Sequence, residues 1–173
     1  MADEGTDEFF DVIDEKGKVL GKERRSAVHR KGLLHKGAYM FVLNGKGQIF
    51  IQKRSGLKDF FPGRWDMSAA EHLKLGESYE GGAARGLKEE LGIENASVEK
   101  IGEKEYHFKS EKREDNEINH VFKASFEGEI KLDSEEVSEG KWIERQELLK
   151  EMEKEPEKFT PWLLNCKDLV EKL

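Results

Sequence analysis

Residues 71–93 read EHLKLGESYEGGAARGLKEELGI, and this stretch carries the pattern that decides the fold. The hydroxyl of Ser78 is typical of a helix N-cap, and the glycine at position 92 is typical of a helix C-terminus. The spacing therefore predicts a helix over roughly 79–91 that begins after Ser78 and stops at Gly92.

Two carboxylates and two glycines share one face of this predicted helix. Positions three and four apart are neighbours on a helix surface, so Gly82 and Gly86 lie beside Glu89 and Glu90. The three glycines within the helix cost about 2–3 kcal/mol relative to alanine. An ordinary solvated helix can also end in two glutamates, but the cost of the glycines indicates a reason for bare backbone beside the acids.

The stretch resembles the box of the Nudix hydrolase family, G-x5-E-x7-R-E-U-x-E-E-x-G-U, in which U is an apolar residue. The matching positions are Glu77, Arg85, Leu87, Glu89, Glu90, Gly92 and Ile93. Two positions depart from the pattern: Glu71 stands where the box opens with glycine, and Gly86 stands where a glutamate follows the arginine.

The resemblance implies a metal site that acts on diphosphates. In the family, box glutamates bind Mg²⁺ or Mn²⁺, and the metal bridges a substrate diphosphate that water hydrolyses. Glu90 would be the principal ligand, Glu89 a second ligand or a carboxylate bound to water, and Glu77 with Arg85 a brace between loop and helix. Hard oxygen ligands suit Mg²⁺, and a bound metal lowers the pKa of a nucleophilic water.

The two departures suggest a reciprocal exchange. The family commonly uses the missing glutamate for metal binding or for positioning the base. We hypothesise that the Glu71 side chain enters the space left at Gly86, which conserves the charge of the site and makes Glu71, Glu89 and Glu90 the catalytic acids. The alternative is that Glu71 points to solvent and the site has decayed.

Further segments resemble the isopentenyl-diphosphate isomerase-like branch of the family, which includes isomerases and many hydrolases of undefined substrate. These segments are 29–35, 52–55, 61–66, 68–72, 115–122 and 159–162. The isomerases hold a metal with histidines and two glutamates. Their counterparts here are His35, His72, Asp115 and Glu117, whereas His29 falls one place out of register. Histidine with carboxylate is a reasonable set for a divalent metal, although each histidine alone is equally compatible with a structural role.

Isomerisation requires an acid and a base on opposite faces of the alkene, and the branch uses a cysteine for one of them. The corresponding residue here is Ala70, and Cys166 lies on an apolar stripe that predicts burial in the core. We therefore rank a hydrolase of a nucleoside diphosphate derivative or related small molecule above an isomerase. A non-catalytic module that binds diphosphates is a third reading.

Basic residues before the box complete the expected site. Lys53, Arg54 and Lys58 resemble the diphosphate-binding cations of the branch, and such charges stabilise a leaving phosphate. A surface loop can carry the same residues without that role.

The order of the expected elements predicts an α+β fold, a mixed β-sheet sandwich with a loop-helix-loop metal site and C-terminal helices. We expect residues 1–8 to form an acidic, disordered tail and residues 9–173 to form a single domain. The expected strands are 9–14, 38–43, 48–52, 65–70, 98–108, 117–126 and 141–143, and the other helices are 146–154 and 161–173. Residues 19–37 read as mostly loop, and Asn44-Gly45 is expected to supply the positive φ of a tight turn.

Composition excludes several classes of function. The 173 residues include 30 basic and 37 acidic ones, and the formal charge of −7 opposes non-specific attraction to nucleic acid. No run approaches the ~20 apolar residues of a membrane span. The acidic first residues do not resemble a signal peptide, and the single cysteine fits a reducing compartment, so a cytoplasmic location is expected. The oligomeric state cannot be read from the sequence.

Overall fold

The computed structural model describes residues 8–173, so the predicted tail lies, apart from Glu8, outside the described residues. The strands are β1 (Phe9–Ile13), β2 (Val19–Arg24), β3 (Leu34–Leu43), β4 (Ile49–Arg54), β5 (Trp65–Asp66), β6 (Ala69–His72), β7 (Glu99–Lys109), β8 (Glu114–Ser125) and β9 (Val137–Ile143). The helices are α1 (Arg25–Lys31), α2 (Tyr79–Leu91), α3 (Arg145–Lys154), α4 (Pro161–Asn165) and α5 (Lys167–Val170), with a 3₁₀ turn at Pro156–Lys158.

Strand β3 is the centre of the mixed sheet. It pairs antiparallel with β1, β4 and β6, and parallel with β8 along its whole length, from Leu34 opposite Asn116 to Leu43 opposite Ser125. Strand β7 pairs with β8, and β9 pairs with β4. Residues Ala38 to Val42 are all buried, because a strand covered on both faces keeps apolar side chains on both. The predicted interior position of this strand is confirmed.

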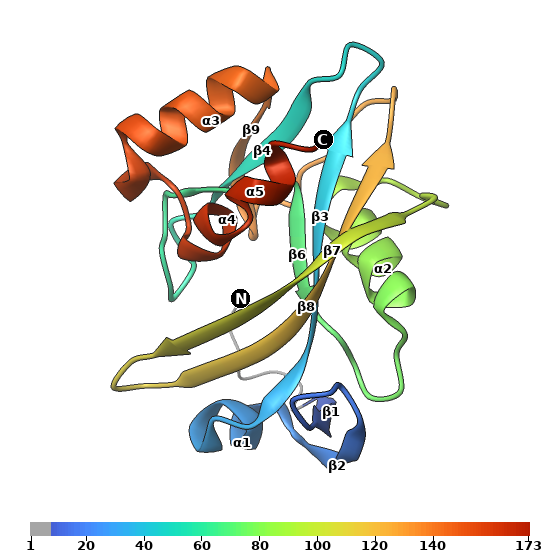
Figure 1. Cartoon of the computed structure of the whole chain (residues 1–173), viewed down its shortest axis with the longest axis vertical. Helices are drawn as coiled ribbons and strands as arrows, with labels where there is room; N and C mark the ends of the chain where they lie inside the picture. Colours follow the sequence, from blue (N-terminus) through green and yellow to red (C-terminus); the bar gives the residue numbers. More distant parts are fainter. Residues whose placement is uncertain (1–7) are drawn as a thin grey trace.

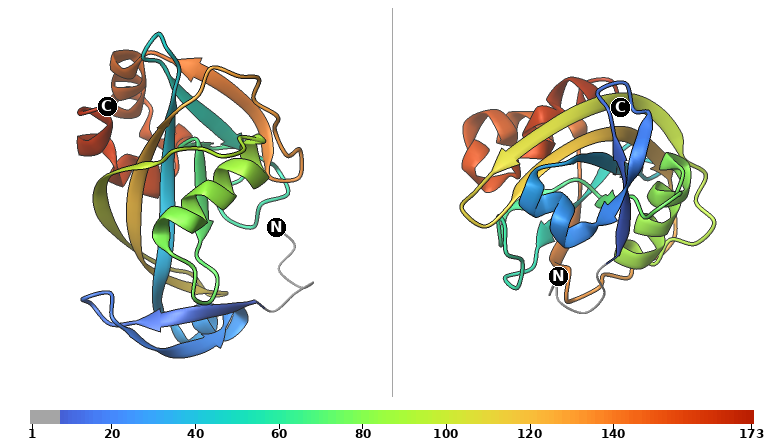
Figure 2. Two further views of the ribbon diagram at one scale, coloured as in Figure 1. Left: turned by 90° about the vertical axis from the view of Figure 1, so that its right-hand side faces the viewer. Right: turned by 90° about the horizontal axis from the view of Figure 1, so that it is seen from below.

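Helices cover both faces of the sheet (Figures 1 and 2). One core lies between the sheet and the C-terminal helices and includes Phe41, Met67 and Phe159. The other lies under α2 and includes Met40 and Leu87. The predicted α+β sandwich is therefore confirmed. Among residues 8–173, no helix combines the length and apolar character needed to cross a bilayer.

Helix α2 follows the sequence prediction closely. The Ser78 hydroxyl accepts a hydrogen bond from the Gly81 amide, and Gly92 ends the helix at φ 68°. Bare backbone is needed where other chain segments approach the helix. A Cβ atom on Gly82 would lie 2.8 Å from Cδ1 of Leu73, and one on Gly86 would lie 2.5 Å from Cγ of Glu71. These contacts explain two of the costly glycines.

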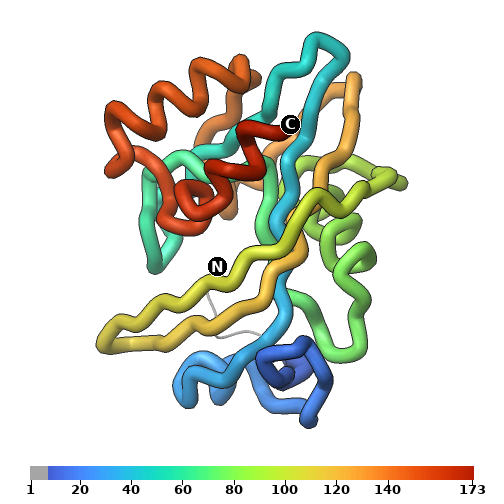
Figure 3. Tube along the Cα trace, viewed as in Figure 1, coloured from blue at the N-terminus to red at the C-terminus, as the bar shows by residue number. Residues whose placement is uncertain are grey.

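Three local predictions were wrong. Residues 19–37 are not loop: β2, α1 and the first residues of β3 fill the segment, and the described N-terminal strands and α1 pack at the lower end of the trace in Figure 3. The last helix is broken at Cys166, where α4 ends and α5 begins. In the β3–β4 turn the positive φ belongs to Gly47, at 75°, because the Asn44 side chain accepts the Lys46 and Gln48 amides and leaves the turn to close one residue later.

Candidate active site and metal centre

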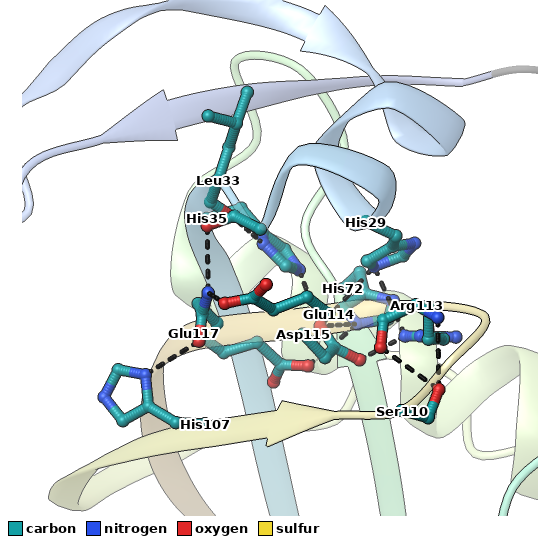
Figure 4. A network of polar contacts seen from close by, with 12 residues as sticks. His29, Leu33, His35, His72, His107, Ser110, Arg113, Glu114, Asp115 and Glu117 are labelled. Atoms are coloured by element: carbon teal, nitrogen blue, oxygen red, sulfur yellow. Dashed lines mark hydrogen bonds and ion pairs between the residues drawn. The ribbon is translucent and has the colours of Figure 1, made fainter.

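Three histidines and an aspartate converge at the start of β3 and β8. The Nε2 atoms of His29, His35 and His72 lie 3.5, 3.3 and 3.6 Å from Oδ1 of Asp115 (Figure 4). One ligand atom from each of the four residues falls within 4.8 Å of the others. The Phe10 ring packs against the three imidazoles at centroid distances of 5.5–6.1 Å, so this cluster has an apolar wall.

His29 reaches the cluster through α1. The helix ends at Gly32, whose φ of 62° turns the chain into β3, and His29 in the last turn is 4% exposed. The sequence comparison placed His29 out of register because it could not anticipate this short helix. Its side chain therefore lies with His35, His72 and Asp115.

The ring orientation of His35 suits metal binding. Its Nδ1 lies 3.0 Å from the Leu33 carbonyl and donates to it, which leaves Nε2 facing Asp115. The buried Nε2 of His35 and Oδ1 of Asp115 have no hydrogen-bond partner. Orphaned buried acceptors are costly, and a metal ligand that donates its other ring N–H to a carbonyl is the usual arrangement. The four residues thus fit a divalent cation.

Charge couples this cluster to Glu117. Burial disfavours protonation of His72, but the Glu117 and Asp115 carboxylates outweigh it and raise the pKa of His72 to about 9. The Nε2 of His72 lies 2.9 Å from Oε1 of Glu117. Burial lowers the pKa of His29 to about 3, which keeps that ring neutral. Burial opposes ionisation of Asp115, yet the close contacts of the three imidazoles and the positive charge of His72 hold its pKa well below the usual range.

The box residues form a second acidic group beside α2. Glu90, at the C-terminal end of that helix, accepts hydrogen bonds from the Ala70 amide at 3.1 Å and from Gln52 Nε2 at 2.7 Å. Burial and the nearby Glu71 carboxylate raise the pKa of Glu90 to about 8. Such a buried acid gains most from an added cation, because a positive charge removes the cost of its ionisation.

Arg85 organises the other box acids. Its guanidinium binds both carboxylate oxygens of Glu77, at 2.9 and 3.0 Å, and donates to the His72 carbonyl. One nitrogen, Nη1, lies 3.1 Å from a carboxylate oxygen of Glu71 and 3.1 Å from one of Glu89. The brace between Glu77 and Arg85 therefore also holds the carboxylates of Glu71 and Glu89.

Glu71 occupies the space beside Gly86. A Cβ atom on Gly86 would lie 2.5 Å from Cγ of Glu71 and 2.7 Å from Cε of Met40. Burial raises the pKa of the Glu71 carboxyl despite its contact with Arg85. The position of the Glu71 side chain agrees with the hypothesised exchange. That Glu71 binds metal remains a proposal.

A cavity reaches the acidic group through Glu71 and the histidine cluster through His72 and Asp115, whereas Glu89 and Glu90 do not line it. Strand β6 places Glu71 and His72 side by side, and both line the cavity together with Arg54 and Lys58. Burial and the neighbouring Arg54 lower the pKa of Lys58, whose ammonium pairs with Glu136, another residue that lines the cavity. Lys53 lies outside the cavity, pairs with Glu139 at 3.5 Å and is one-third exposed.

Aromatic residues that the sequence reading did not assign form one wall of the cavity. Phe61 contacts Phe108 and Trp162 edge-on at centroid distances of 5.6 and 5.4 Å, and Tyr106 contacts Trp162 at 5.5 Å. The signal available in the sequence was the alternation of β7, which places Tyr106 and Phe108 on one face. Cys166 is fully buried in the core under the C-terminal helices, as predicted.

A family model and several relatives of known name match this chain in sequence. A family model described as NUDIX domain matches residues 33–163. Isopentenyl-diphosphate Delta-isomerase 2 of Photorhabdus laumondii is 31% identical over 157 residues, which are 90% of this chain and 88% of that protein. An uncharacterized Nudix hydrolase of Clostridium acetobutylicum is 38% identical over 72% of this chain and 62% of its own length.

The arrangement of elements also matches a solved structure. A crystal structure from Deinococcus radiodurans superposes with a TM-score of 0.74 at 22% identity and covers 95% of this chain and 98% of that one. A MutT protein from Methanosarcina mazei gives a TM-score of 0.64 at 23% identity over 80% of this chain and 91% of its own. These structures support the shared fold alone.

Proposed function

Because this chain belongs to the NUDIX domain family, we propose that it is a divalent-metal-dependent hydrolase that cleaves the diphosphate linkage of a nucleoside diphosphate derivative or related small molecule. The observation that carries the proposal is that one cavity is lined by an acid of the box, a histidine and cations. Glu71, His72 and Lys58 all face it. A diphosphate needs both a metal ligand set and positive side chains, and this cavity offers both.

Two sets of residues would hold metal. Glu71, Glu89 and Glu90 offer the hard oxygen atoms that suit Mg²⁺ or Mn²⁺. The second set is His29, His35, His72, Asp115 and Glu117. Imidazole ligands favour Mn²⁺ or other transition ions over Mg²⁺. When bound, a divalent ion supplies charge neutralisation for the diphosphate and lowers the pKa of a nucleophilic water.

The protein's own groups would position the substrate. Arg54 and Lys58 would bind phosphate oxygens, and the low-dielectric cavity strengthens those contacts. To bind them, Lys58 would exchange Glu136 for the substrate. The aromatic wall of Phe61, Phe108 and Trp162 would contact the organic group and exclude water.

An isomerase is the second candidate because one observation favours it. Glu117 contacts His72, faces the same cavity as Tyr106 and thus could exchange a proton with a ligand there. Relatives named isopentenyl-diphosphate Delta-isomerase align with about nine-tenths of the chain. Against it, Ala70 stands where that branch carries its cysteine, and its methyl group cannot transfer a proton.

Incubation with a panel of nucleoside and prenyl diphosphates plus Mg²⁺ or Mn²⁺, followed by phosphorus and proton NMR, tests the proposal. We expect release of phosphate or a monophosphate, lost in Glu90→Gln and kept in the matched control Glu94→Gln, whose carboxylate is on the surface. A rearranged prenyl product without hydrolysis would establish the isomerase instead. Tight binding without any product would indicate a diphosphate-binding module.

A further inference from the structure

Arg113 brings a positive charge to the edge of the four-residue cluster His29, His35, His72 and Asp115. Its Nη2 lies 3.3 Å from Nε2 of His29 and donates to Oδ2 of Asp115 (Figure 4). One guanidinium nitrogen therefore contacts two of the four residues that would hold a divalent ion. Arg113 also lines the cavity, and its guanidinium carbon lies 5.0 Å from the centroid of the Phe60 ring.

The backbone of the β7–β8 turn fixes this placement. The Ser110 amide donates to the Arg113 carbonyl at 2.8 Å, and the Ser110 hydroxyl accepts from the Arg113 amide at 3.1 Å. Phe60 covers one face of the guanidinium, and the Nε atom of Arg113 is buried. The side chain is thus held at the cluster from both ends rather than extended into solvent.

The contact with His29 is incompatible with metal binding through the same atom. An arginine has no acceptor, so His29 Nε2 must accept the hydrogen bond with its lone pair. A metal ion requires that same lone pair. The guanidinium and a divalent ion also repel each other at this separation, and the surroundings are largely desolvated.

We propose that Arg113 is an internal cation that competes with the divalent ion for His29 and Asp115 and must move away from His29 when the metal binds. The competition lowers the affinity of the cluster and restricts it to ions that bind imidazole strongly. A displaced guanidinium remains beside the cavity that also contains Arg54 and Lys58. This inference rests on the proposed metal-dependent function only in requiring that an ion enters the cluster.

Binding of Co²⁺ to the whole chain tests the competition, because its visible absorption reports histidine ligands. Excess Mg²⁺ occupies the box carboxylates, and Co²⁺ is titrated into the wild type, Arg113→Met and the control Lys112→Met. Lys112 is an exposed residue of the same turn, so its substitution removes an equal charge without removing a contact to the cluster. Arg113→Gln serves as a second neutral variant, and thermal unfolding verifies that each variant folds.

We expect Arg113→Met and Arg113→Gln to bind Co²⁺ about tenfold or more tightly than the wild type, because a charge-assisted hydrogen bond no longer has to be broken. Lys112→Met should stay near the wild type. Equal or weaker binding by the Arg113 variants overturns the competition and leaves the proposed hydrolase intact. Absence of any histidine-type Co²⁺ spectrum in all four proteins overturns both the competition and the metal site beneath it.

Discussion

The Glu71 side chain occupies the space beside Gly86 between β6 and α2, so a side chain at position 86 would compete with it. Even the Cβ atom of a residue at position 86 would overlap with side-chain atoms of Glu71 and Met40. Overpacking of this kind costs about 1–3 kcal/mol. Only one of the two positions can therefore place a side chain in this space.

This reasoning predicts the outcome of a double-mutant cycle. Gly86→Glu alone should lower the free energy of unfolding by about 1–3 kcal/mol, because two side chains compete for one space. Glu71→Gly alone should weaken Mn²⁺ binding. The double variant should recover most of the lost stability and metal affinity, measured by urea unfolding and calorimetry. A double variant no more stable than Gly86→Glu would contradict the exchange hypothesis. A Glu71→Gly protein with unchanged metal affinity would contradict it as well.

Glu90 predicts how stability changes with pH. Its pKa rises from the ordinary 4.5 to about 8 on folding, so the folded state holds this proton more tightly than the unfolded chain. Between those values the unfolded state binds fewer protons, and stability falls as pH rises. The raised pKa of His72 acts in the same direction between 6.5 and about 9. Without metal, the melting temperature should therefore decrease from pH 6 to pH 9.

Thermal unfolding in a chelator measures this slope. Glu90→Gln should show a shallower decrease than the wild type, since its amide does not titrate, whereas Glu94→Gln should follow the wild type. A wild-type melting temperature that rises over this range would contradict the assignment of a buried, protonated Glu90.

At the scale of elements, Asp66 ties β5 to α4. Its Oδ1 accepts hydrogen bonds from the Met67 amide, the Thr160 hydroxyl and Trp162 Nε1, at 2.8, 3.0 and 2.7 Å. Thr160 also caps α4 by accepting the Leu163 amide. One buried carboxylate thus holds both the first turn of a short helix and the tryptophan of the cavity wall.

Asp66→Ala should consequently lower the free energy of unfolding by about 3 kcal/mol or more, because two buried donors and one partly buried donor lose a charged acceptor. Asp168→Ala is the matched control, since its carboxylate is 55% exposed and pairs with Lys104 on the surface, a pair worth about 1 kcal/mol at most. Urea unfolding of both variants provides the comparison. Equal losses would show that Asp66 does not anchor α4.

Local sequence signals predicted several elements correctly, whereas other elements carry no such signal. Ser78 and Gly92 carry the cap signals of α2, so its bounds were predictable. Helix α1 has seven residues, and its N-cap residue Arg24 makes no side-chain capping hydrogen bond, so residues 19–37 gave no such signal. The break at Cys166 was hidden because its apolar stripe continues across α4 and α5.

The contacts of the candidate active site also divide into those that the sequence predicts and those that it does not. Glu77 and Arg85 could be paired from the box, and the structure pairs them. His29 could not be placed, because its position depends on the turn at Gly32 and the short helix before it. Gln52 contacts Glu90 only through the tertiary arrangement of β4 and α2, which no local spacing reports. Arg113 stands two residues before Asp115, but its contact with His29 likewise depends on the tertiary fold.

For the whole molecule, metal binding should appear as added stability. A ligand that binds only the folded state stabilises it by about 2.7 kcal/mol at a hundredfold excess over its dissociation constant. Zn²⁺ should therefore raise the melting temperature of the wild type. His35→Ala should lose this increase, because His35 is fully buried among the proposed ligands. His107→Ala, on an exposed ring of β7, should keep it. An equal increase in His35→Ala would place the ion elsewhere.

The parallel ladder of β3 and β8 sets when the histidine cluster can come together. It joins residues 34–43 to 116–125, segments about eighty positions apart, and pairing at such separation is entropically slow to nucleate. His35 and Asp115 lie at the beginning of the two strands. A chain in which these strands have not yet paired therefore has no assembled pocket for an ion. A newly made polypeptide would thus bind its metal only late in folding. Partly folded intermediates, in which His35 and Asp115 are still apart, would not hold the ion at this cluster.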